Sequence, residues 1–118
     1  MKSIFGLEQN IAAALSYIFG PISGLAVLIM ERENKFVRFH AMQATLWFSL
    51  LLIVGWVLAI IVDIPVLGVV LGIILNPLLA IGSIIWFVSL AFLMFKAFSN
   101  DTFKIPIIGE IVWSQVSK

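Results

Sequence analysis

The hydrophobic positions of the chain fall into three long runs separated by short polar segments. Residues 11–30 and 41–62 carry no charge, and a third uncharged run extends over residues 66–95. At 1.5 Å per residue, about 20 apolar residues match a hydrocarbon core of roughly 30 Å. The pattern predicts an all-α polytopic membrane protein with one domain, residues 1–118, and three transmembrane helices at about 11–30, 40–62 and 66–96.

Prolines interrupt two of the three runs. Pro21 follows Gly20 in the middle of the first run, where the missing backbone hydrogen bond predicts a kink that faces neighbouring helices. Pro77 follows Asn76 in the third run, which is too long for one untilted span. This run is either one long helix bent at Asn76-Pro77 or a re-entrant segment followed by a full span. We favour the bent helix, because ten residues cannot cross the bilayer alone and open backbone in lipid is costly. Asn76 then either bonds the backbone that Pro77 frees or lines a pathway.

Both ends of the chain have an amphipathic pattern. Apolar residues recur there at helical spacing, as Ile4, Leu7 and Ile11 before the first run and as Ile108, Ile111, Val112 and Val116 near the C-terminus. We expect these short segments to lie in the membrane interface.

Composition supports the membrane assignment and excludes several function classes. Hydrophobic residues make up 63% of the 118 residues and charged residues 11%, against about 45–50% and about 25% in typical soluble domains. A soluble chain of this length lacks the interior to bury so much apolar surface. The chain has no cysteine, which excludes thiol chemistry. A net charge of +1 without a basic block argues against a nucleic-acid partner.

Charge placement predicts an orientation for the three-span arrangement. The loop after the first run and the C-terminal segment hold most of the cations: Arg32, Lys35, Arg38, Lys96, Lys104 and Lys118. Lys2 is the remaining cation, and Asp63 ends the second run. The positive-inside rule therefore predicts an outside N-terminus and a cytoplasmic C-terminus.

A polar collar precedes the second run, made of Lys35, Arg38, His40, Gln43 and Trp47. His40, Gln43 and Trp47 share one face of a helix through i+3 and i+4 steps. The collar is either a hydrogen-bond clamp between helices or a contact site for lipid headgroups or a partner. His40 is the single histidine and has no convincing ligand or nucleophile partner, so we expect no metal, no cofactor and no enzymatic activity.

Several segments resemble one family of small prokaryotic membrane proteins. They are the aromatic-x-x-Gly-Pro segment that ends at Pro21, the Val-Arg-Phe-His-Ala-x-Gln run of residues 37–43, and a Lys-Ala-aromatic segment at 96–98 followed by a Pro-x-x-Gly turn at 106–109. In these features the chain resembles the Tic20-like family, which is related to the plastid inner-envelope import component. The resemblance implies a prokaryotic cell membrane and, through the plastid relative, protein translocation.

Together these observations predict a non-enzymatic integral membrane protein. Its collar would bind a partner protein or anionic lipid on the cytoplasmic face. We also expect a homo-oligomer or a membrane-protein partner, because a three-helix unit has little interior of its own. The alternative is a small channel or protein-translocation component.

Overall fold

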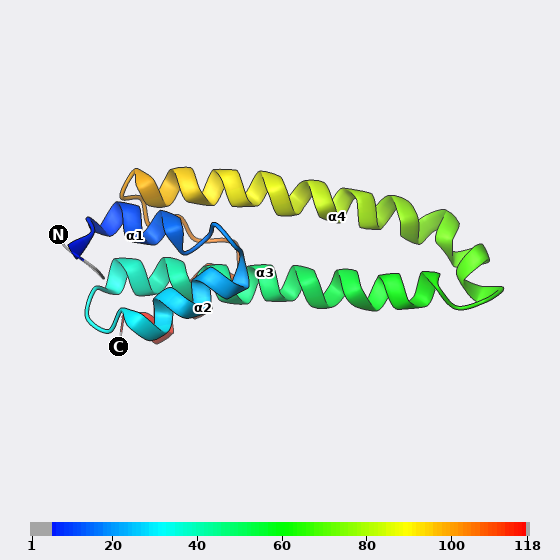
Figure 1. Cartoon of the computed structure of the whole chain (residues 1–118), viewed down its shortest axis with the longest axis horizontal. Coiled ribbons are helices and arrows are strands. Elements are labelled where there is room, and N and C mark those ends of the chain that lie inside the picture. Colours follow the sequence, from blue (N-terminus) through cyan, green and yellow to red (C-terminus); the bar gives the residue numbers. More distant parts are fainter. Residues whose placement is uncertain (1–5, 118) are drawn as a thin grey trace.

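Two long antiparallel helices run the length of the molecule, and three short helices pack against them at one end (Figure 1). The computed structural model describes residues 6–117. The helices in this part are α1 (Gln9–Leu15), α2 (Pro21–Met30), α3 (Lys35–Val62), α4 (Leu67–Phe98) and α5 (Ile108–Val116). The molecule extends over 55 × 24 × 24 Å. We call residues 6–48 and 86–117 the head, and residues 49–85, a two-helix hairpin, the arm.

Local sequence defines both ends of α3. Asn34 caps its N-terminus, because the side-chain Oδ1 accepts a hydrogen bond from the Val37 amide at 3.1 Å. The helix ends at Val62, and Asp63 is its C-cap. Pro65 disfavours helical backbone at Ile64, the residue before it, so the helix does not continue. Gly68 then lets α4 start close to α3, since a Cβ at this position would lie 2.0 Å from the Val62 carbonyl oxygen.

The two long helices match two of the three predicted spans. Both α3 and α4 are long and apolar enough to cross a membrane, and only 6% of the most apolar 18-residue stretch of each is buried. A core helix of a soluble protein would be mostly buried, so the exposed apolar surface indicates lipid. The third run forms one continuous helix with Pro77 inside it, which confirms the single helix over a re-entrant pair.

The first predicted span is wrong. Residues 11–30 do not form one crossing helix: α1 ends at Leu15, and α2 runs back beside it from Pro21 (Figure 1). The reversal depends on Gly20, whose φ of 62° and ψ of −126° favour glycine. Pro21 therefore begins a helix, where its missing N–H costs little, and does not kink one. Within residues 6–117 the number of candidate spans is two, not three.

This correction changes the predicted topology. The described N- and C-terminal ends and the α2–α3 loop all lie at the head (Figure 1). Ends on opposite membrane sides required a third crossing helix, and residues 6–117 contain two candidate spans. Lys2, Ile4 and Lys118, which entered the charge and amphipathicity arguments, lie outside the described residues. The C-terminal amphipathic stripe does form a helix, α5, with Val112 and Val116 buried and Ile111 exposed.

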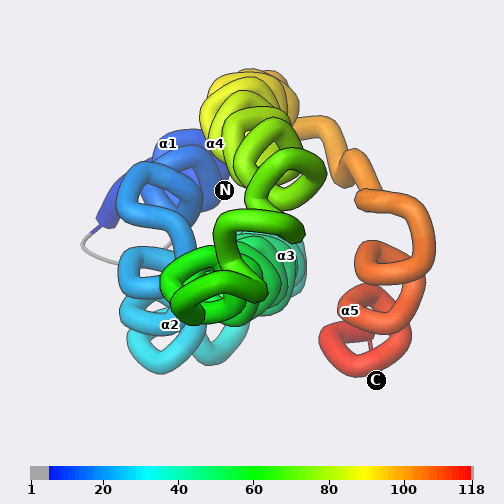
Figure 2. The backbone as a smooth tube through the Cα atoms, turned by 90° about the vertical axis from the view of Figure 1, so that its right-hand side faces the viewer, coloured from blue at the N-terminus to red at the C-terminus, as the bar shows by residue number. Residues whose placement is uncertain are grey.

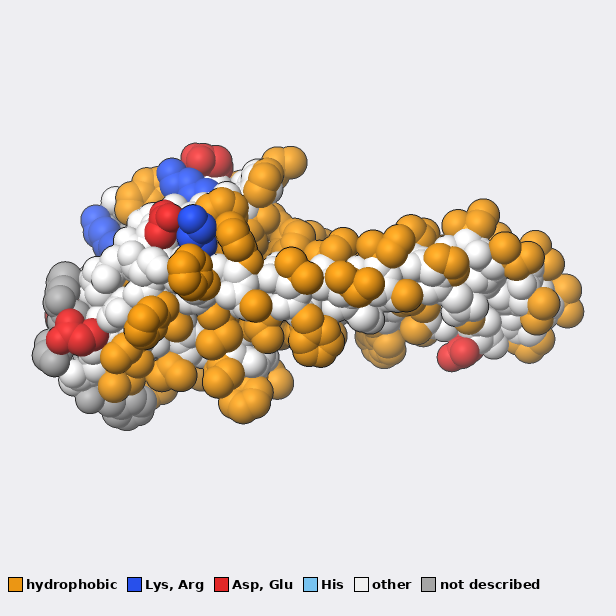
Figure 3. All heavy atoms as spheres, turned by 90° about the horizontal axis from the view of Figure 1, so that it is seen from above, with side chains coloured by type: hydrophobic (Ala, Val, Ile, Leu, Met, Phe, Trp, Pro, Cys, Tyr) orange, Lys and Arg blue, Asp and Glu red, His pale blue; other side chains and the backbone are white. Residues whose placement is uncertain are grey.

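The core of the protein lies in the head. Its contacts are made by small residues of α1 (Ala12, Ala13 and Ala14) and by larger ones including Tyr17, Phe48 and Leu93. The only buried residues of the arm are Gly68 and Gly72. Figure 3 shows most charged side chains gathered at the head, and an arm covered by hydrophobic side chains except for one acidic side chain near its tip.

Candidate functional site: a buried polar network and a basic hollow

A buried hydrogen-bond network joins three side chains in the head. The Tyr17 hydroxyl lies 2.6 Å from His40 Nδ1, and Gln43 Nε2 lies 3.0 Å from the same hydroxyl. All three residues are fully buried. One helical turn separates His40 and Gln43 on α3, so both face the turn between α1 and α2, where Tyr17 lies.

The bonding pattern determines the proton positions. Gln43 Nε2 donates to the Tyr17 oxygen and to the Phe103 carbonyl, at 3.0 Å each. The Tyr17 O–H therefore donates to His40 Nδ1, and His40 Nε2–H donates to the Asp101 carbonyl at 2.9 Å. This assigns a neutral histidine protonated on Nε2. Burial raises the pKa of the Tyr17 hydroxyl above its ordinary value, which keeps it a donor.

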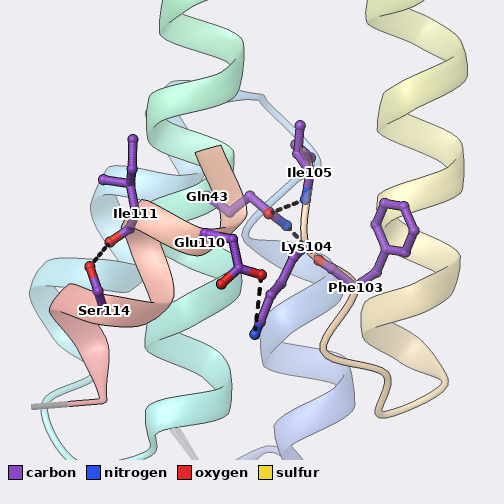
Figure 4. Close-up of polar contacts among 7 residues, drawn as sticks. All are labelled: Gln43, Phe103, Lys104, Ile105, Glu110, Ile111 and Ser114. Carbon is purple, nitrogen blue, oxygen red and sulfur yellow. Dashed lines mark hydrogen bonds and ion pairs between the residues drawn. The ribbon is translucent and has the colours of Figure 1, made fainter. Parts of the chain in front are cut away.

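The network attaches the segment between α4 and α5 to α3. Gln43 Oε1 accepts a hydrogen bond from the Ile105 amide at 2.9 Å, and Figure 4 shows the Gln43 amide between Phe103 and Ile105. Phe36 and Phe39 enclose the imidazole, with ring centroids 4.8 and 5.1 Å from that of His40. In the described chain no buried side-chain nitrogen or oxygen lacks a hydrogen-bond partner. This arrangement holds the head together and exposes neither His40 nor Gln43.

A second polar feature is a basic hollow of about 340 Å³ on the head surface. Its lining comes from the α2–α3 loop, the start of α3 and the end of α5: Arg32, Glu33, Lys35, Arg38, Met42, Gln115 and Val116. Arg38 Nη1 donates to the carbonyls of Leu28, at 3.1 Å, and Glu31 at the C-terminus of α2. Lys35 Nζ donates to the Ser117 carbonyl at 3.2 Å.

The predicted collar is thus divided among three places. His40 and Gln43 belong to the buried network, and Lys35 and Arg38 to the basic hollow. Trp47 lies apart from both, and its Nε1 donates to Ser89 Oγ of α4 at 3.1 Å.

The other predicted residues lie elsewhere. Pro21 starts α2 in the head, whereas Asn76 and Pro77 are exposed on the arm and take no part in either feature. Sequence reasoning missed Tyr17 as a partner of the collar. The available signal was that it is the only tyrosine of the chain and lies in an apolar run.

An apolar groove of about 710 Å³ runs between α3 and α4 on the arm. Its lining includes Leu52, Gly55, Trp56, Leu79 and Gly82 of the arm, and it extends to Phe87 at the edge of the head. Among residues 6–117, no group of three or more His, Cys, Asp or Glu residues is placed to hold a metal ion.

Comparisons with known proteins identify relatives over nearly the whole chain. The model of a family described as magnetosome magnetite crystal formation proteins matches residues 8–112. A UPF0132 membrane protein of Archaeoglobus fulgidus is 40% identical over 111 residues, which cover 93% of this chain and 97% of the relative. A UPF0132 membrane protein of Methanocaldococcus jannaschii is 42% identical over 110 residues, which cover 93% of this chain and 90% of the relative.

No solved structure matches the chain. The matched family and these relatives are not Tic proteins, so the predicted Tic20-like membership is wrong. The motifs that suggested it lie within the segment that the magnetosome family matches. The translocation role that the resemblance implied loses its support with it.

Proposed function

The chain belongs to the magnetosome magnetite crystal formation protein family, and we propose that it is a non-enzymatic membrane scaffold whose basic hollow binds the phosphate of anionic lipids. For this chain, the observation that supports lipid binding is the convergence of Arg32, Lys35 and Arg38 on one hollow.

The depth of the hollow supports a lipid headgroup as its ligand. With Val62 at the far boundary of the hydrocarbon core, roughly 30 Å or about 20 residues of α3 bring the near boundary to Gln43. Arg38 lies five residues beyond, about 8 Å farther out, within the headgroup layer. The hollow therefore opens at the level of lipid phosphates.

The distribution of charge supports a cytoplasmic head. All lysines and arginines of residues 6–117 lie in the head: Arg32, Lys35, Arg38, Lys96 and Lys104. The arm contributes one charged residue, Asp63, at the C-cap of α3. By the positive-inside rule both described ends face the cytoplasm, where anionic headgroups attract basic residues.

The three cations have distinct roles in this proposal. Arg38 is held by the carbonyls at the end of α2 through Nη1, and its other guanidinium N–H groups are the donors available to a phosphate. Arg32 and Lys35 add charge at the rim. Glu33 lines the same hollow and offsets part of this charge.

No specific contact favours the channel alternative, because Gly68 and Gly72 of the described chain lie against residues of their own hairpin, Val62 and Asn76.

Lipid binding to the purified full chain tests this proposal. Native mass spectrometry in neutral detergent, titrated with phosphatidylglycerol or phosphatidylcholine, should show preferential retention of phosphatidylglycerol. The double variant Arg32→Gln/Lys35→Gln should weaken it roughly 30-fold, at about 1 kcal/mol per cation. Lys104→Gln is the matched control, because it removes a head cation that pairs with Glu110 at 3.6 Å, outside the hollow. Equal affinity of the double variant and the wild type would refute the proposal.

A further inference from the structure

The α1–α2 hairpin has an apolar face that the rest of the described chain leaves largely exposed. Phe19 is 71% exposed, Ile22 76% and Ile29 62%. The opposite face of α2 is buried, with Gly24 and Val27 against the rest of the head. A one-sided apolar face of this kind on a membrane protein requires an apolar partner.

The depth of this hairpin limits what that partner can be. A Cβ at Gly20, in the turn, would lie 3.4 Å from Phe48 Cβ and 3.0 Å from the Trp86 ring, so the turn reaches the level of these two residues. Phe48 is five residues past Gln43 along α3, or about 8 Å below the near boundary of the hydrocarbon core. One leaflet contributes about half of a hydrocarbon core of roughly 30 Å, or about 15 Å. The hairpin therefore enters one leaflet and stops within it.

The rest of the head widens the protein in the same leaflet. Viewed along the long axis, α1 and α2 lie on one side of the α3–α4 pair and α5 on the other (Figure 2). On the α5 side, Ile107 is 76% exposed and Ile111 53%. The far leaflet meets only the arm. Each added helix is about 10 Å across, so the protein displaces much more lipid on the head side than on the arm side.

From this difference in width between the two leaflets, we infer that the protein acts as a wedge in the head-side leaflet. Acyl chains of that leaflet cover the α1–α2 face. The protein concentrates where that leaflet is convex. Lipid is the occupant that the structure favours, because the exposed face is uncharged and its deeper part, at Phe19 and Ile22 beside the Gly20 turn, shares its depth with the lipid-facing surfaces of α3 and α4. The inference does not depend on headgroup binding by the basic hollow.

Insertion depth is the first test. The chain has no cysteine, so Ile22→Cys and Ile73→Cys each give a single labelling site, at positions of matched type and exposure, 76% and 78%. A fluorophore at residue 22 should be quenched by brominated lipid of the head-side leaflet. One at residue 73, about 9 Å from the start of α4, should be quenched from the other leaflet. If lipid fails to quench residue 22, a second copy or another protein covers the face, and the inference is wrong.

Curvature sorting is the second test. The full chain, reconstituted in neutral phosphatidylcholine giant vesicles with the head outward, should be enriched several-fold in a narrow tube pulled from the vesicle. The variant Phe19→Ser/Ile22→Ser/Ile29→Ser should lose most of this enrichment while Phe19→Leu/Ile22→Val/Ile29→Val keeps it. Circular dichroism and the thermal midpoint in detergent verify that each variant is folded.

The wild type also tests the inference without any variant. Equal density of the wild-type protein in tube and vesicle would overturn it, even if the serine variant does not fold. Full sorting by a folded serine variant would overturn it as well. Because the lipid is neutral, loss of phosphatidylglycerol binding and loss of curvature sorting can be told apart.

Discussion

The head and the arm both consist of hydrophobic helices, but the apolar side chains of the two regions have different surroundings. In the head, alanines and glycines bring helices close, and Tyr17, His40 and Gln43 exchange hydrogen bonds in the interior. In the arm, large side chains such as Val69 and Ile73, each 78% exposed, point away from the two-helix hairpin. The head is therefore packed as a protein interior, whereas the arm relies on lipid as its solvent. Matched substitutions in the two regions should have different and sometimes opposite effects.

The largest difference should come from replacing a polar side chain in each region. Gln43→Met leaves the Ile105 N–H and the Phe103 carbonyl without their partner, and should lower the free energy of unfolding by roughly 3–5 kcal/mol. Asn76→Leu removes an amide that is exposed on the arm, and should be neutral or stabilising. Denaturant titration in detergent micelles measures both. A Gln43→Met cost no larger than the effect of Asn76→Leu would show that the network contributes little to stability.

A second contrast concerns how closely helices approach. A Cβ at Gly24 would lie 2.9 Å from the Ala41 carbonyl oxygen and from the Thr45 amide nitrogen. These are backbone atoms of α3 and cannot move aside, so Gly24→Ala should separate α2 from α3 at a cost of about 2 kcal/mol. The thermal midpoint in micelles should fall. An unchanged midpoint would mean that α2 is not held against α3.

A smaller effect should come from the indole groups. Trp47→Phe removes the hydrogen bond to Ser89 and should cost about 1 kcal/mol. Trp56→Phe, at a position 71% exposed on the arm, should cost much less. The double variant Trp47→Phe/Ser89→Ala separates the bond from lost packing. If Ser89→Ala adds its full single-variant cost in the Trp47→Phe background, the two side chains are not coupled.

The long helices of both regions could be predicted from the sequence because local rules determine them. The uncharged runs on either side of Asp63 and Pro65 predicted spans at 40–62 and 66–96, and the structure has Lys35–Val62 and Leu67–Phe98. The run of residues 11–30 is equally uncharged, but hydropathy does not distinguish a crossing helix from a hairpin that returns. Gly20-Pro21 at its midpoint was the local signal for the turn.

The candidate site was only partly predictable for a related reason. Spacing on one helix placed His40 and Gln43 on a common face. Their partners at Asp101, Phe103 and Ile105 are backbone groups about 60 positions away in the chain, and nothing in their side chains indicates the contact. Tyr17 became a partner because the first run turns back at Gly20, so the missed hairpin and the missed network have one cause.

The smallest expected effect tests whether lipid or a neighbouring protein helix fills the apolar groove of the arm. A Cβ at Gly55 or Gly82 would meet no atom within 4 Å, and both residues line the apolar groove of the arm. If lipid alone fills this groove, Gly55→Ala and Gly82→Ala should each stabilise the protein by about 0.5–1 kcal/mol, because alanine loses less conformational freedom in a helix. The sign is opposite to that of Gly24→Ala in the head.

If a neighbouring helix occupies the groove, the new methyl group would instead push it away, and both variants would weaken that association. Unfolding measured in micelles and again in bilayers distinguishes the two cases, since lipid filling predicts stabilisation in both media and helix packing predicts a loss in the bilayer.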